Sequence, residues 1–384
     1  MVGFLCIPFH LTNKKGSDTM ERHIFRRILS FGLLLLLLVS LTACGGSASS
    51  KEPIRILDGK TISVMGDSIS TFGGVSNNPD INSTIGNNAV YYKSGYYGFE
   101  LEDTWWYQAA EMTGAEILVN NSWSGSTTYL PQKGEGSQGF RDRSVNLHDN
   151  SGREPDIVAI YLGTNDFNTA NGMYGSPATI QYDKLVATDG SYKDPESFCE
   201  AYALMLARIK HRYPNAEIFC FTILDRKDLK GNTDRISYFN GFIKTIAEKS
   251  GAHIVDLYKD SGMSGSELSY AAHIVDDYLH PSLAGMDAIT DCFVSAIYNY
   301  SRYVDDSVKT HEVSYKLKDV IVLEGQPTVV QDGTALECIL SAGREVPLDI
   351  TVTMDGKDVT KKYVDGDTVY IPAVTGKVVI NASR

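Results

Sequence analysis

Residues 61–70 read Thr-Ile-Ser-Val-Met-Gly-Asp-Ser-Ile-Ser, and the fold class of the chain follows from this stretch and its surroundings. Ile62–Met65 is a short, mostly apolar run, which is typical of a strand buried on both faces. Gly66, Asp67 and Ser68 come directly after it. In an open α/β sheet ligands bind at the carboxyl ends of the strands, so Ser68 is a candidate nucleophile. The alternative is an ordinary turn in which the aspartate caps a helix and the serine is solvated.

Similar runs follow along the chain, each four to seven residues long and rich in β-branched or aromatic side chains: Ile117–Asn120, Ile157–Leu162, Glu217–Ile223 and His253–Asp256. Helix-like segments alternate with these runs: Thr104–Thr113, Pro195–Arg212, Ser237–Lys249 and Ser282–Tyr300. In the second segment apolar residues recur every three or four positions, so one of its faces is apolar. This alternation predicts an α/β domain over residues 61–303, with a mostly parallel sheet in a three-layer α/β/α arrangement.

The pattern changes after about Tyr303. Short β-rich runs separated by Asp-Gly pairs replace the helices: Leu348–Met354, Thr368–Pro372 and Lys377–Ile380. Such spacing predicts a small C-terminal all-β module, similar to a β-sandwich, over residues 304–384. Modules of this kind are mostly spacers or binding accessories, and no candidate catalytic group stands out in this one.

The first 43 residues predict a secretory signal. Three arginines precede an apolar stretch, Ile28–Ala43, which is shorter than the roughly 20 residues that a membrane-spanning helix needs. The four residues that end at Cys44, Leu-Thr-Ala-Cys, resemble the lipobox of bacterial lipoproteins, which implies cleavage before Cys44 and a diacylglycerol on its sulfur. A short anchor helix kept in the mature protein is the alternative. Residues 44–60 predict a tether, so we expect an exported bacterial lipoprotein, anchored to the outer face of the cell membrane through Cys44.

The composition narrows the class of function. The 384 residues are 43% hydrophobic and 21% charged, so the chain can bury a sizeable core. Its formal charge of −12 leaves no basic surplus to neutralise phosphates, which argues against a nucleic-acid partner. Cys199, Cys220 and Cys292 fall in apolar or helix-like segments, and no cysteines have a metal-ligand spacing such as Cys-x-x-Cys. We therefore expect buried free thiols rather than disulfides or a metal site.

Two more segments place reactive groups beside predicted strands or helices. Asn165 follows a strand, and its side-chain amide can donate a hydrogen bond to negative charge that develops on a substrate oxygen. Asp277 and His280 lie three residues apart, just before the last helix. A serine nucleophile needs a base, and the base needs an acceptor that fixes its tautomer. Each segment alone is also a common turn, but together with Ser68 they supply nucleophile, oxyanion donor, base and orienter.

In the order of these motifs, over roughly Ile62 to Tyr300, the chain resembles the SGNH, or GDSL-type, hydrolase superfamily. The resemblance implies a flavodoxin-like fold and a mechanism without metal or cofactor. It also implies that Ser68 is the nucleophile and that its own backbone N–H helps to form the oxyanion hole. The second motif of the family matches Asn120-Asn-Ser-Trp-Ser-Gly125, which points to the N–H of Gly125 as a further oxyanion donor.

The resemblance implies the same remaining roles that the chemistry of the residues suggests. Asn165 belongs to the oxyanion hole, Asp277 is the orienting group and His280 is the base. The chain departs from the family in reading Ser-Ile after Gly-Asp, where the family has Ser-Leu, and in two long insertions between the motifs.

The insertions, residues 72–103 and 167–194, are where specificity is expected. A long loop in a compact domain is usually functional. The first insertion is rich in tyrosine, and flat aromatic faces suit sugar rings, whereas a lipase would favour a channel of Leu, Val and Ile. We expect four aromatic residues to bind substrate: Trp105, Trp106, Tyr97 and Trp123. Packing of the aromatics onto the sheet is the alternative.

The sequence thus predicts a serine esterase that hydrolyses a small-molecule or polysaccharide ester through an acyl-enzyme, with O-deacetylation of a carbohydrate as the first expectation. A lipid esterase, lysophospholipase or thioesterase is the alternative reaction. A glycan-binding surface lipoprotein without catalysis is the alternative class. The complete set of candidate groups argues against that class: Ser68, Gly125, Asn165, Asp277 and His280.

Overall fold

The sheet that carries the candidate site has five parallel strands. The computed structural model describes residues 51–75, 90–170, 172–227, 233–264, 266–305 and 307–384. The strands are β1 (Thr61–Gly66), β2 (Glu116–Asn120), β3 (Ile157–Tyr161), β4 (Glu217–Phe221) and β5 (His253–Val255). They lie in the order β2-β1-β3-β4-β5, and each neighbouring pair is parallel. The predicted parallel sheet is confirmed.

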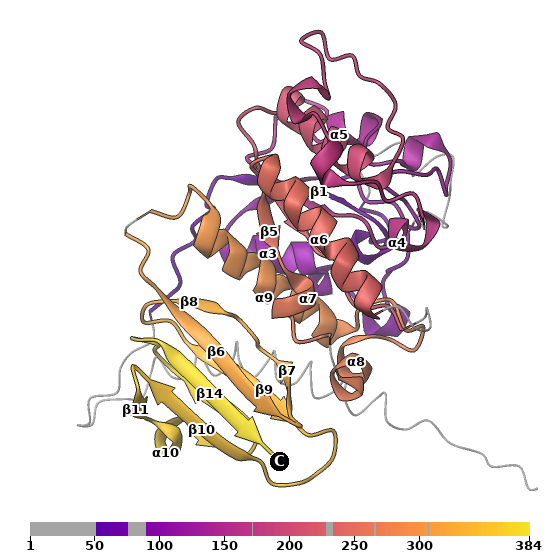
Figure 1. Cartoon of the computed structure of the whole chain (residues 1–384). Helices are drawn as coiled ribbons and strands as arrows, with labels where there is room; N and C mark the ends of the chain where they lie inside the picture. The colour runs from indigo at the N-terminus through magenta and orange to yellow at the C-terminus, as the bar shows by residue number, and fades with distance from the viewer. Residues whose placement is uncertain (1–50, 76–89, 171, 228–232, 265, 306) are drawn as a thin grey trace, which may run out of the picture. The chain divides into compact units, whose positions relative to one another are not determined.

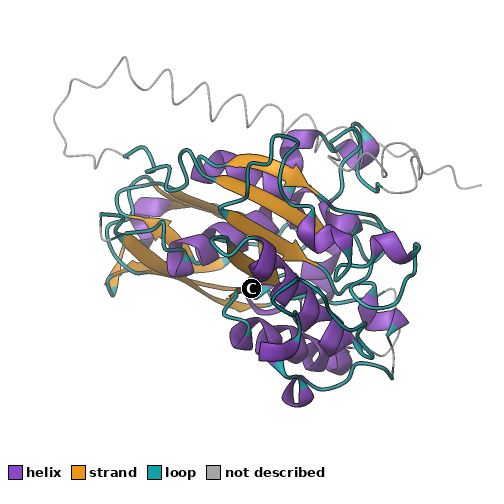
Figure 2. Cartoon of the chain, turned by 90° about the horizontal axis from the view of Figure 1, so that it is seen from above, coloured by secondary structure: helices purple, strands orange, loops and turns teal. Residues whose placement is uncertain are grey.

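Helices cover both faces of this sheet, which confirms the predicted α/β/α class (Figures 1 and 2). The helices are α3 (Trp105–Thr113), α4 (Asp166–Thr169), α5 (Phe198–Arg212), α6 (Thr233–Lys249), α7 (Leu257–Asp260), α8 (Glu267–His273) and α9 (Leu283–Tyr300). Residues of α3 and α9 share one apolar core with Ile157 and Ala159 of β3. Residues of α5 and α6 share the other core with Val158 and Ile160. Successive residues of a strand point to opposite faces, so β3 is buried from both sides.

Ser282 sets the beginning of α9, and Gly114 sets the end of α3. Ser282 caps α9, because its side chain accepts a hydrogen bond from Gly285 N at 3.3 Å. Gly114 ends α3 in the left-handed conformation, with φ of 83°. The cap at Ser282 leaves His280 in the turn just before α9, at the same edge of the sheet as the carboxyl ends of β1 and β3.

The C-terminal region is built from antiparallel and mixed sheets, which confirms the predicted all-β class (Figure 1). Its elements are β6 (Thr310–Lys318), β7 (Ile321–Glu324), β8 (Val329–Gln331), β9 (Leu336–Ser341), β10 (Asp349–Met354), β11 (Lys357–Asp358), α10 (Thr360–Tyr363), β12 (Val364–Asp365), β13 (Thr368–Ile371) and β14 (Val378–Ser383). One sheet has the order β11-β10-β14-β6-β8 and the other β12-β13-β9-β7. Their inner faces form a separate apolar core. The boundary at residues 303 and 304 stays a prediction.

The predicted signal over residues 1–43, Cys44 and the tether as far as residue 50 lie outside the described residues. Within the described ranges, no helix combines the length and the hydropathy needed to cross a bilayer. The prediction of free thiols is confirmed for Cys199, Cys220 and Cys292, which are buried and unpaired, as is Cys338.

Candidate active site

Ser68 lies in a tight turn at the carboxyl end of β1. A single 3-10 turn, Ser68–Ser70, begins there, and Asp67 caps it by accepting a hydrogen bond from Ile69 N at 3.0 Å. The turn packs so closely on the strand that a Cβ at Gly66 would overlap the Ser70 side chain, so glycine is required at that position. Ser68 is only 5% exposed, so most of its surface is shielded from water.

The structure brings Ser68 and His280 into contact across the sheet edge. His280 Nε2 lies 2.7 Å from Ser68 Oγ, although the two residues are 212 positions apart in the sequence. His280 Nδ1 lies 2.6 Å from Asp277 Oδ2. An ionised carboxylate can only accept hydrogen bonds, so Nδ1 carries the proton and Nε2 is free to accept the proton of the Ser68 hydroxyl. This is the connectivity of a nucleophile, a base and an orienting group.

Asp277 accepts four hydrogen bonds. Its Oδ1 accepts from Leu279 N at 3.0 Å and from His280 N at 2.9 Å. Its Oδ2 accepts from His280 Nδ1 and, at 2.5 Å, from the hydroxyl of Tyr91. Burial raises the pKa of Asp277, but these hydrogen bonds outweigh burial and hold the pKa well below its usual value. The carboxyl group is therefore ionised over the whole range in which the histidine can act as a base.

The three candidate oxyanion donors are all present. Among the described residues, neither the N–H of Ser68 nor the N–H of Gly125 has a hydrogen-bond acceptor. Gly125 has φ of 74°, a conformation that favours glycine. Asn165 Nδ2 donates to Ser126 O at 2.8 Å, which occupies one of its two amide hydrogens. Asn165 is partly exposed, so its second hydrogen is left for a ligand.

Two buried charged residues that the sequence analysis missed hold the loop that contains Gly125. Arg143 donates through Nη2 to Gly66 O and to Asn121 O, both at 2.7 Å. It thereby ties the end of β1 to the residues after β2. Nothing in the sequence around Arg143 marks it, because its acceptors are main-chain carbonyls from distant segments. Burial lowers the pKa of this guanidinium to about 10.

Asp166 supports the same loop from α4. Its carboxyl group accepts hydrogen bonds from Thr128 N at 2.7 Å and from Tyr129 N at 2.8 Å. Burial raises the pKa of Asp166 to about 6 despite these two donors. The sequence could have pointed to Asp166 as a residue of the site, because it directly follows Asn165 and completes the Gly-Thr-Asn-Asp turn.

The prediction that three tryptophans bind substrate stays a prediction, and the structure places all three of them in buried positions. Trp105 is 0% exposed, Trp106 2% and Trp123 5%, so little of any of these rings is accessible in this structure. The first two lie on the inner side of α3, where their indole N–H groups donate to Ser70 Oγ and Ser70 O at 3.2 and 3.0 Å. They support the turn of the nucleophile from beneath, which is the packing alternative.

The tyrosines of the first insertion lie beside His280 instead. The ring of Tyr91 is stacked on the His280 ring, with centroids 3.4 Å apart. The ring of Tyr96 contacts the ring of Tyr91 edge-on, with centroids 5.5 Å apart. The ring of Tyr96 also contacts the ring of Tyr97 edge-on, with centroids 4.6 Å apart. Tyr96 is 37% and Tyr97 is 42% exposed, and Tyr97 donates to Asp276. Of the four predicted binding residues, only Tyr97 is at an accessible surface next to the candidate site.

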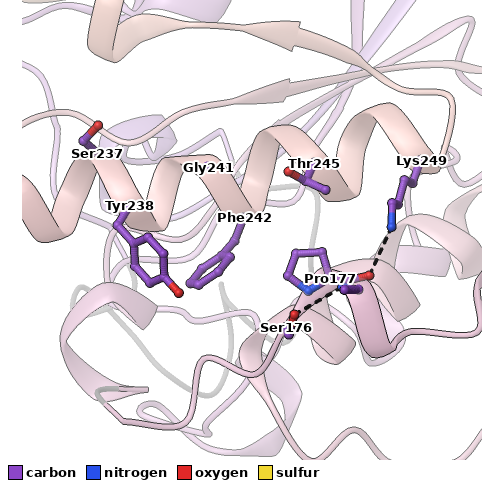
Figure 3. A pocket seen from close by; sticks show the side chains of 9 residues that line it. Ser176, Pro177, Ser237, Tyr238, Gly241, Phe242, Thr245 and Lys249 are labelled. Atoms are coloured by element: carbon purple, nitrogen blue, oxygen red, sulfur yellow. Dashed lines mark hydrogen bonds between the residues drawn. The ribbon is translucent and has the colours of Figure 1, made fainter.

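An open groove of about 650 Å³ lies between the second insertion and α6. Figure 3 shows Tyr238 and Phe242 on α6 facing Ser176 and Pro177. None of the predicted site residues lines this groove. Within the part of the chain that the structure describes, no cluster of three or more His, Cys, Asp or Glu side chains could hold a metal ion.

The sequence matches one family model, described as GDSL-like Lipase/Acylhydrolase, over residues 60–297. Solved structures similar to this chain include two proteins provisionally described as GDSL-like lipases. One, from Bacteroides ovatus ATCC 8483, is 25% identical, with a TM-score of 0.44, and the match covers 63% of this chain and 99% of that one. The other, from Bacteroides uniformis ATCC 8492, is 26% identical, with a TM-score of 0.43, covering 63% and 96%.

A variant of an acetyl xylan esterase from Geobacillus stearothermophilus is 19% identical, with a TM-score of 0.40, and the match covers 64% of this chain and 97% of that one. No curated protein matches the sequence. The family assignment rests on the match over residues 60–297.

Proposed function

The chain belongs to the GDSL-like lipase/acylhydrolase family and is a serine ester hydrolase, and from this premise we propose that Ser68, His280 and Asp277 are its catalytic residues. One observation carries the proposal. Ser68 Oγ, His280 Nε2, His280 Nδ1 and Asp277 Oδ2 form one continuous hydrogen-bonded chain with distances of 2.7 and 2.6 Å. Such a chain moves a proton from the serine as it attacks and stabilises the imidazolium that results.

The proposed reaction has two acyl-transfer steps. His280 Nε2 takes the proton of Ser68, and Oγ attacks the ester carbonyl carbon. The oxyanion that forms is held by the N–H groups of Ser68 and Gly125 and by the free amide hydrogen of Asn165. His280 then protonates the leaving alcohol, which gives the acyl-enzyme. Water, deprotonated by the same imidazole, attacks this acyl-enzyme and releases the acid and free Ser68.

We propose an acylated carbohydrate as the substrate, with O-deacetylation as the reaction. The support is the exposed aromatic surface beside His280, made by Tyr96 and Tyr97, because such faces stack on the apolar sides of sugar rings. Tyr278, two residues before the base, adds a further ring that is 59% exposed.

The variant Tyr97→Ala tests whether the substrate is an acylated carbohydrate rather than another ester. We expect Tyr97→Ala to lower kcat/KM for an acetylated polysaccharide about fivefold, since one aromatic contact contributes on the order of 1 kcal/mol. Turnover of p-nitrophenyl acetate is expected to stay unchanged, because so small an ester reaches only the catalytic groups. Tyr300→Ala is the matched control, since Tyr300 is 54% exposed at the opposite end of α9.

Equal losses on both substrates would mean that Tyr97 supports the site rather than the glycan. Higher activity of the wild-type protein on p-nitrophenyl palmitate than on acetyl esters would favour a lipid esterase.

We also propose that the protein acts outside the cell as a lipoprotein. The support is the sequence of residues 20–44, in which arginines, an apolar run and Leu-Thr-Ala-Cys44 follow one another. A tethered esterase at the cell surface has access to polymeric glycans that do not cross the membrane.

A further inference from the structure

Tyr91 contacts both members of the Asp277–His280 pair. Its ring is stacked on the His280 ring, with centroids 3.4 Å apart and an angle of 11° between the planes. Its hydroxyl lies 2.5 Å from Asp277 Oδ2, the same oxygen that accepts from His280 Nδ1. The residue belongs to the first insertion, which lies between the family's motifs.

We propose that Tyr91 is a positioning residue that holds the Asp277–His280 pair in its reactive geometry and sets the pH range in which His280 acts as a base. The inference rests on the proposed function. The stacked ring limits rotation of the imidazole, because turning the imidazole would bring it into the phenol plane at 3.4 Å. The hydroxyl fixes Oδ2, and therefore the direction along which His280 Nδ1 donates.

The hydroxyl also controls the charge that Asp277 presents. Burial and the nearby carboxylate of Asp277 raise the pKa of Tyr91 well above its usual value, so the phenol stays protonated and remains a donor. Its hydrogen bond to Oδ2 is charge-assisted and takes up part of the carboxylate's negative charge. Without this hydrogen bond, more negative charge would remain on Asp277 Oδ2. The carboxylate would then stabilise the protonated form of His280 more strongly.

Other ionisable groups surround His280 and are the same with or without the Tyr91 hydroxyl. Asp67, in the turn after β1, interacts electrostatically with His280, and burial raises the pKa of Asp67. Tyr92 meets the His280 ring at a steep angle, with centroids 6.2 Å apart, and donates to Pro281 O at 2.8 Å. Asp276 accepts from Tyr97. A change confined to the hydroxyl of Tyr91 therefore isolates its effect on the pair.

Tyr91→Phe tests the proposal, because it keeps the stacked ring and removes only the hydrogen bond. The measurement is kcat and KM for p-nitrophenyl acetate as a function of pH. We expect the acid limb of kcat/KM to move up by about half to one pH unit, and kcat at the plateau to fall about threefold to tenfold, as expected for loss of one charge-assisted hydrogen bond. KM should not change, since the small ester does not reach Tyr91.

Tyr303→Phe is the matched control. Tyr303 also donates its hydroxyl to an aspartate, Asp156 Oδ1 at 3.1 Å, but this aspartate precedes β3 at the opposite edge of the sheet. This control should leave the acid limb in place. Tyr91→Leu removes the ring as well and should lower kcat more than Tyr91→Phe does.

The proposal is overturned if the acid limb of Tyr91→Phe coincides with that of Tyr303→Phe, or if its loss lies in KM alone. Equal kcat values for Tyr91→Phe and Tyr91→Leu would refute the role of the stacked ring. Ser68→Ala, measured beside them, separates this result from a failure of the catalytic assignment. An inactive Ser68→Ala with an unshifted Tyr91→Phe would reject the inference on Tyr91 alone, whereas an active Ser68→Ala would reject the proposed function.

Discussion

The side-chain amide of Asn165 has one structural role and one proposed catalytic role. One hydrogen is bound to Ser126 O at 2.8 Å, which fixes the direction of the amide before any substrate is present. Preorganised donors of this kind stabilise developing charge without reorganisation during the reaction. The neighbouring Asp166 holds the same loop through Thr128 N and Tyr129 N, so the amide and the loop that carries Gly125 are fixed from one short helix.

We expect Asn165→Ala to lower kcat by about 10²–10³, the typical loss for one oxyanion donor, with much less change in KM. The measurement is steady-state kinetics on p-nitrophenyl acetate. Asn168→Ala is the control, because Asn168 lies in the same helix with an exposed side chain. A loss in KM alone would place Asn165 among ground-state binding groups.

At the scale of the elements, the strands of the parallel sheet could be predicted because each contains a short apolar run, and β1, β3 and β4 are buried along their whole length. The strand β6 could not, because its pattern is weak. In β6, Thr310–Lys318, only Val313 is fully buried, and the strand is defined by pairing with β14 and β8. Such pairing joins segments far apart in the sequence and leaves little local trace.

The residues of the candidate site also fall into two groups, those that could be predicted from the sequence and those that could not. Ser68, Asn165, Asp277 and His280 could be predicted because each follows a strand or precedes a helix in a characteristic motif. The burial of Trp105 and Trp106 could not, since an aromatic next to a long loop has the same local sequence whether it faces solvent or the core. Arg143 could not be predicted either, because its partners lie in three separate segments.

Arg143 is expected to be essential for the junction between β1 and the loop after β2. Replacing it by Met leaves the carbonyls of Ser137, Gly66 and Asn121 without this donor, and we expect unfolding free energy to fall by about 3 kcal/mol. Urea denaturation measures the change. Arg153→Met is the control, because Arg153 pairs with Glu116 at the surface and should matter much less. Equal stability of the two variants would contradict the role given to Arg143.

At the scale of the whole molecule, the acidic charge of −12 argues against a nucleic-acid partner, and the proposed lipid anchor would place the protein at a membrane surface. The C-terminal β region is joined to the catalytic region through α9. Gln326 N donates to Asp291 Oδ2 at 2.7 Å and Thr328 N to Ser295 Oγ at 3.2 Å. These two hydrogen bonds connect the C-terminal β region to α9.

Cys44→Ala should release the protein from the membrane fraction of the producing cell or leave it unprocessed. The expected wild-type product begins at Cys44 and carries lipid, which intact-mass analysis detects. Cys338→Ala changes a buried thiol and should leave the distribution unchanged. An unmodified Cys44 in a chain that keeps residues 1–43 would contradict the proposed localisation.

The central claim is that Ser68 is the nucleophile, and labelling with an alkyl fluorophosphonate followed by peptide mapping tests it most directly. This reagent reacts preferentially with a serine that is activated by its base. We predict one adduct, on Ser68, that is absent in Ser68→Ala and strongly reduced in His280→Ala, together with loss of ester turnover in both variants. An adduct on another residue, or unchanged turnover in Ser68→Ala, would contradict the account.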